Sequence, residues 1–87
     1  MPNLEIGRQL VKSSGSVGAN YIEANEALSK KDFVVRIKMC RKESKESRYW
    51  LRLVYVKEKK DENERKSLIQ EFTELMKIFG SILEKCR

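Results

Sequence analysis

Five basic side chains recur at steps of three and four residues in the middle of the chain: Lys38, Arg41, Lys45, Arg48 and Arg52. On a helix this spacing places them on one face. A row of Lys and Arg attracts phosphate through charge and counterion release and does not read sequence. Residues 29–56 hold nine Lys and Arg but three Asp and Glu, which accounts for the whole net charge of +6. The row therefore predicts a polyanionic partner, either RNA, DNA or an acidic protein surface.

Four other polar residues are candidates for a structural network: Asn20, Glu23, Arg36 and Glu43. Asn20 and Glu23 are three residues apart in the first helical segment, and a buried carboxylate there would need a partner. Arg36 and Glu43 lie two turns apart within the apolar arc of the second segment, so that Arg36 is the expected partner. The alternative is that these are exposed charges on the rims of the helices.

Catalytic chemistry has little support in this sequence. The chain has no His, which removes the usual general base and the commonest metal ligand. The carboxylates Glu23, Glu43 and Glu46 could converge, but helical bundles that bind metals through carboxylates usually pair Glu with His. Cys40 and Cys86 are too far apart in sequence for a zinc or redox motif and are interpreted as packing residues. We expect no enzymatic activity, no metal and no cofactor.

The composition favours an all-α protein. A chain of 87 residues, with 40% hydrophobic and 37% charged residues and a single Pro, suits one small helical domain over residues 1–87. The apolar spacing predicts three long helices at about 3–26, 30–56 and 62–86, packed as an antiparallel bundle. No apolar run approaches the roughly 20 residues that span a bilayer, and no signal peptide is evident. We therefore expect a cytoplasmic protein without membrane contact.

The middle helix has the clearest sequence signature. Ser29 and Asp32 form a capping box, and Leu28 with Phe33 predicts a hydrophobic staple at the same end. The apolar and small residues that follow alternate in steps of four and three and predict one buried stripe: Phe33, Ile37, Cys40, Ser44, Ser47, Leu51 and Val54. A similar stripe runs through residues 68–86, preceded by a second possible capping pair, Asp61 and Glu64.

The first helix contains an unusual run of small or slender residues at 13–19. Each Gly in a helix interior costs about 1 kcal/mol relative to Ala. Close approach of a neighbouring helix would offset that cost, in which case Gly18→Leu should destabilise the protein by overpacking. The alternative is a flexible loop between two short helices.

Three stretches together resemble a known family. They are Ser-Val-Gly-Ala-Asn-Tyr-Ile-Glu-Ala at 16–24, Ser-Lys-Lys-Asp-Phe at 29–33 and Lys-Glu-Ser-Lys-Glu-Ser-Arg-Tyr-Trp-Leu at 42–51. The pattern is similar to the 23S rRNA intervening-sequence proteins, also called four helix bundle proteins, to which the accessory variability proteins of diversity-generating retroelements are related. The motif positions that match here look structural rather than catalytic: Asn20, Glu23, Phe33, Glu43, Glu46, Tyr49 and Trp50.

The resemblance implies an antiparallel four-helix-type bundle that assembles as a homo-oligomer, a pentamer in known relatives. It also implies that the first helix of the family is missing from this chain. The related accessory proteins are basic, bind nucleic acid and engage a reverse transcriptase.

Two functions remain open on these grounds. The first is a non-enzymatic, oligomeric bundle that binds nucleic acid non-specifically through the basic helix face. The alternative is a self-associating scaffold or accessory subunit that binds a protein partner, such as a reverse transcriptase, without touching nucleic acid. Binding that weakens steeply with salt distinguishes the first from the second.

Overall fold

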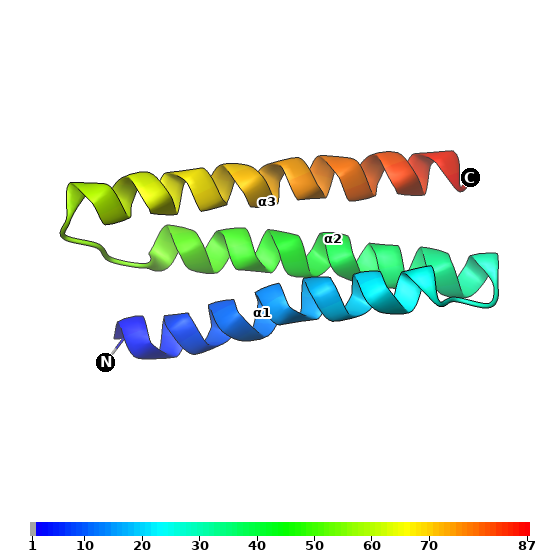
Figure 1. Ribbon diagram of the computed structural model, residues 1–87, viewed down its shortest axis with the longest axis horizontal. Helices are drawn as coiled ribbons and strands as arrows, with labels where there is room; N and C mark the ends of the chain where they lie inside the picture. The colour runs from blue at the N-terminus through cyan, green and yellow to red at the C-terminus, as the bar shows by residue number, and fades with distance from the viewer. Residues whose placement is uncertain (1) are drawn as a thin grey trace.

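The computed structural model describes residues 2–87, which form three helices and no strand: α1 (Pro2–Asn25), α2 (Lys30–Leu53) and α3 (Lys59–Lys85). The fold is all-α and antiparallel, as predicted. Figure 1 shows α2 in the middle, with α1 and α3 on either side of it. Among the described residues, α1 and α3 each pack along α2, whereas the two outer helices meet only through side chains, with the rings of Tyr21 and Phe79 6.4 Å apart. The Cα atoms consequently span a flat shape of 46 × 22 × 14 Å.

Helix α2 begins as the sequence predicts. Ser29 is extended, with φ −138° and ψ 156°, and its hydroxyl accepts a hydrogen bond from the backbone N–H of Asp32 at 3.1 Å. The predicted staple is wrong, because the Leu28 side chain is fully exposed and therefore does not pack on Phe33. The helix ends at Leu53 rather than Val56, since Val54 turns to extended backbone.

The contact between α1 and α2 is built from small residues. The Ser47 hydroxyl lies 2.8 Å from that of Ser13, and the Cys40 thiol donates to the Val17 carbonyl at 3.5 Å. A side chain can reach a backbone carbonyl across a helix pair only when the two helices approach closely. The run at 13–19 is therefore helical, and the loop alternative is wrong.

The glycines of that run do not take part in the close contact. Gly15 and Gly18 are exposed, and a Cβ added at either would meet no atom within 4 Å. They lie on the side of α1 turned away from α2, since a step of one or two residues from Ser13 or Val17 rotates a side chain by 100° or more. The expectation that Gly18→Leu would overpack a helix contact is wrong within this chain.

Helix α3 contributes one fully buried side chain, Phe79, which packs with Val17, Ala24, Ile37 and Cys40 in the core. Its start lies at Lys59, before the predicted capping pair Asp61 and Glu64. Glu58 precedes the helix without a side-chain cap.

An arginine on α3 fixes the end of α2. Arg65 donates from Nη1 to the Leu51 carbonyl at 3.0 Å while its Nε and Nη2 bind both carboxylate oxygens of Glu62. This guanidinium satisfies one of the carbonyls that a helix leaves unpaired at its C-terminus.

The core is thin for a chain of this size. The accessible surface is 6439 Å², whereas a compact protein of 10.2 kDa exposes about 5,300 Å². Large apolar side chains remain exposed on both outer helices, including Leu4, Val11 and Ile22 on α1 and Leu68 and Ile78 on α3. None of the helices in residues 2–87 has an apolar stretch long enough to cross a membrane.

Candidate nucleic-acid interface

The five residues of the predicted basic row lie on α2 along its border with α3. Lys38, Arg41, Lys45 and Arg52 are exposed, whereas Arg48 is half-buried and donates from Nη1 to the Thr73 hydroxyl at 3.2 Å. Within residues 2–87, none of the five forms an ion pair. The ion pairs that do form join neighbours within α1, α3 and the C-terminal segment. The basic row is therefore unneutralised.

A groove of about 480 Å³ between α2 and α3 runs beside the basic row, which we call the basic groove. Its lining consists of four cations and two apolar side chains: Lys38, Arg41, Lys42, Lys45, Met76 and Leu83. A smaller hollow of about 380 Å³ continues it past Gly80 toward Arg87. The sequence prediction omitted Lys42, although its spacing of four from Lys38 and three from Lys45 places it on the adjacent side of the same helix.

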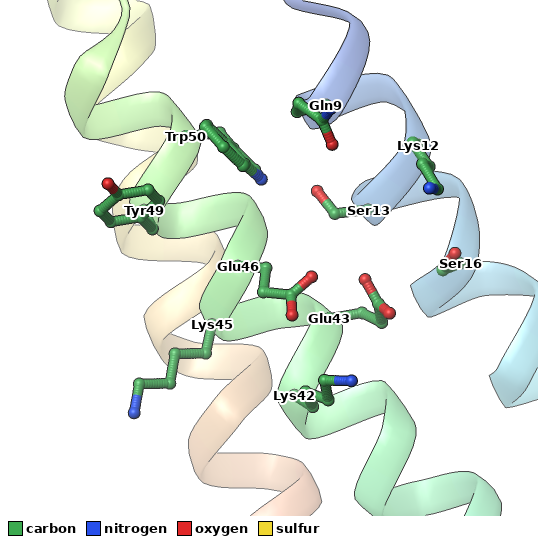
Figure 2. A pocket seen from close by; sticks show the side chains of 10 residues that line it. All are labelled: Gln9, Lys12, Ser13, Ser16, Lys42, Glu43, Lys45, Glu46, Tyr49 and Trp50. Carbon is green, nitrogen blue, oxygen red and sulfur yellow. The ribbon is translucent and has the colours of Figure 1, made fainter. Parts of the chain in front are cut away.

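A second groove, of about 640 Å³, separates α1 from α2, and we call it the aromatic groove. Its residues come from both helices: Gln9, Lys12, Ser13, Ser16, Lys42, Glu43, Lys45, Glu46, Tyr49 and Trp50. In Figure 2 the carboxylates of Glu43 and Glu46 point from α2 toward α1, and the nitrogen-bearing edge of Trp50 faces the same space, while Lys45 extends away. Lys42 and Lys45 thus border both grooves.

The two carboxyl groups of the aromatic groove influence each other. Burial raises the pKa of the Glu43 carboxyl, and the negative charge of the neighbouring Glu46 raises it further. Lys42 and Lys12 act in the opposite direction but more weakly. Neither carboxylate forms an ion pair with any described residue. No third metal-ligating side chain joins them within the described chain.

The structure brings together part of the predicted polar network. Arg36 donates from Nη1 to the Asn20 side-chain oxygen at 3.2 Å, and Asn20 donates its amide to the Ser16 carbonyl at 2.9 Å. The Glu23 side chain is exposed and forms no hydrogen bond or ion pair in the part of the chain described, because it lies about 60° or more outside the buried stripe of α1. Glu43 faces the aromatic groove and does not join Arg36. The proposed four-residue network is therefore wrong for Glu23 and Glu43.

Comparison with known proteins identifies the family of this chain. The family model described as "23S rRNA-intervening sequence protein" matches residues 2–81. This chain belongs to the 23S rRNA-intervening sequence protein family. No match was found among curated proteins.

A solved relative within this family has the same fold. A protein with unknown function from the S23 ribosomal protein family of Bacteroides thetaiotaomicron superposes with a TM-score of 0.79 and is 31% identical. The similarity covers 91% of this chain and 70% of that one.

Several residues that carry the sequence resemblance to the 23S rRNA-intervening sequence proteins meet in one place. Glu43, Glu46, Tyr49 and Trp50 all line the aromatic groove. Sequence reasoning treated them as structural, and it missed Gln9, Lys12 and Ser16 across the groove. These three residues line the groove only because α1 packs against α2. The periodicity of a single helix does not predict that pairing.

Proposed function

We propose that this protein binds nucleic acid without sequence preference through the basic row and the basic groove. The observation that carries the proposal is that five cations share one helix face while no described carboxylate neutralises them. Like charges at helical spacing repel one another and weaken the fold. A polyanion removes that repulsion and gains further free energy by releasing its own counterions. The proposal describes a non-enzymatic binding protein of the bacterial cytoplasm.

The lining of the basic groove suits a phosphate backbone better than a compact anion. Its cations are spread along about two turns of α2, from Lys38 to Lys45, so that they match a linear array of charges. Met76 and Leu83 provide an apolar surface on the α3 wall of the groove for sugar contacts. Contacts of this kind position a nucleic acid and do not specify its sequence.

The test is a charge reversal of the exposed row: Lys38→Glu, Lys45→Glu and Arg52→Glu in one protein. Binding to duplex DNA and structured RNA is measured by fluorescence polarisation over a salt series, with helicity checked by circular dichroism. If these residues contact three phosphates, their loss removes about 2.7 from the slope of log K against log salt for duplex DNA. The matched control reverses three exposed cations at the start of α3, Lys59, Lys60 and Lys66.

We expect the row variant to lose binding at about 150 mM salt with unchanged helicity, and the control variant to retain most of it. Equal binding by the row variant and the unmodified protein would refute the basic-row proposal. A comparable loss in the control would show that net charge, and not the row, determines binding.

The alternative function, a self-associating scaffold or accessory subunit for a protein such as a reverse transcriptase, rests on a different observation. The chain exposes about 1,100 Å² more surface than a compact protein of its mass, which exceeds the roughly 800 Å² that each partner buries in a stable interface. Exposed apolar residues on α1 and α3 contribute to that surface. An oligomer, such as the pentamer that the family resemblance implies, would cover part of it.

Light scattering in the same salt series tests this alternative. An oligomer that ignores both nucleic acids at about 150 mM salt supports the scaffold function. A monomer at all concentrations contradicts it.

A further inference from the structure

The aromatic groove lies beside the basic row but differs from it in chemistry. Trp50 is half-buried on its wall, and Tyr49 packs edge-on against it with ring centroids 5.1 Å apart and planes at 68°. This neighbour holds the indole in place at the mouth of a groove of about 640 Å³, within the range of small-molecule pockets. A positioned aromatic ring is the platform on which unpaired nucleobases stack.

The carboxylates give the groove hydrogen-bond acceptors that no cation of the described chain pairs with. Glu43 and Glu46 point into the same space (Figure 2), and within the described chain no Lys or Arg pairs with either. Carboxylates accept hydrogen bonds from exocyclic amino groups of bases, as Glu does from the amino group of cytosine. Guanine presents two adjacent N–H donors on its Watson–Crick edge, which match the two oxygens of one carboxylate.

The basic row connects this groove to a nucleic-acid backbone. Lys42 and Lys45 border both grooves, and Lys12 supplies a further cation from α1 on the opposite wall. Because Lys45 extends away, Lys12 and Lys42 balance the formal charge of the two Glu in the groove, and the lining is not net negative. A nucleic-acid strand whose phosphates lie along the basic row can therefore place one base in the aromatic groove. Its phosphates then do not approach a surface of net negative charge.

We propose that the aromatic groove binds an unpaired base of single-stranded nucleic acid, guanine in preference to uracil, by contact with the Trp50 indole and by hydrogen bonds to Glu46 and Glu43. The proposal rests on the proposed function, because the strand reaches the groove along the basic row. It adds a preference for unpaired over paired nucleic acid that the basic row alone does not give.

The single Trp of the chain provides the assay. Because a base in contact with the indole quenches its fluorescence, Trp50 emission is titrated with the pentanucleotide UUGUU, with the same strand carrying inosine for guanosine, and with UUUUU. Inosine lacks only the exocyclic amino group, so it isolates one donor to the carboxylates. We expect saturable quenching by UUGUU and about fivefold to tenfold weaker binding of the inosine strand.

The variant that tests the carboxylate is Glu46→Gln, which keeps the side-chain shape but replaces one acceptor oxygen by an N–H donor. It should bring the guanosine and inosine strands to equal affinity. The matched control is Glu71→Gln, an exposed residue on α3 that lines neither groove, and it should preserve the difference. Circular dichroism checks that both variants keep their helicity.

The outcomes separate this inference from the proposed function. The base site is refuted if the unmodified protein binds the guanosine and inosine strands with equal affinity. It is also refuted if polarisation detects binding but Trp50 fluorescence is not quenched. In either case, salt-dependent binding of duplex DNA would still support the proposed function. Absence of binding to every nucleic acid refutes both. If guanosine monophosphate binds as tightly as UUGUU, the strand contributes nothing to binding, and the proposed path of the strand along the basic row is refuted.

Discussion

Replacing Gly15 and Gly18 together by Ala is expected to stabilise this protein. Both glycines lie inside α1, neither has a positive φ, and an added Cβ at either would meet no atom within 4 Å. The substitution therefore costs no packing energy within the chain. It removes the conformational freedom that Gly retains in the unfolded state and that Ala lacks.

The magnitude follows from helix propensity. Each Gly→Ala change inside an exposed helix contributes about 0.5–1 kcal/mol, so the pair should raise the free energy of unfolding by about 1–2 kcal/mol. For a domain of this size, 1 kcal/mol corresponds to a Tm shift of about 4–8 °C. Thermal and urea unfolding followed by circular dichroism measure both quantities.

A matched control is available in α3. A Cβ at Gly80 would lie 3.9 Å from Arg41 Cζ, an ordinary contact, so Gly80→Ala should also stabilise the protein, by about 0.5–1 kcal/mol. If Gly80→Ala stabilises while the α1 pair destabilises, the reasoning is refuted, because the glycine side of α1 must then pack closely against something. Repeating the measurement at two protein concentrations identifies a second copy as that neighbour, since only an association makes Tm depend on concentration.

Two further predictions concern the core and the aromatic groove. Phe79→Ala should cost about 3–5 kcal/mol in urea unfolding, because Phe79 is the buried anchor of α3, whereas Ile78→Ala at an exposed neighbour should change stability by at most about 0.5 kcal/mol. Glu43→Gln should raise Tm at neutral pH, and the gain should shrink as pH falls through the raised pKa of Glu43, because the folded state already holds that proton at low pH. If the increase in Tm persists at low pH, the negative charge of Glu43 is not what destabilises the folded protein.

The helices were predictable because their signals are local. The stripe from Phe33 to Val54 identifies the buried face of α2, and Ser29 identifies its start, without knowledge of any other segment. The staple failed for the opposite reason. Leu28 lies in the connection between α1 and α2, where helical periodicity does not determine which side chains are buried, and it is fully exposed.

Features that need two helices escaped prediction. Asn20 and Glu23 both seemed available to Arg36, but the rotation of α1 against α2 brings only Asn20 within reach. Likewise, the spacing of Arg48 predicted an exposed member of the basic row, whereas Thr73 of α3 binds its guanidinium. The glycine run indicated close packing, and the packing occurs through Ser13 and Val17 beside the glycines.

The central position of α2 also has a consequence for how the chain folds. The helix pairs that pack, α1 with α2 and α2 with α3, are each neighbours along the chain and are joined by short connections. Local contacts of this kind carry a small loop-closure cost and accompany fast folding. Either helical hairpin can nucleate first, but both require α2. Folding can therefore start from either hairpin, but every route requires α2 to form.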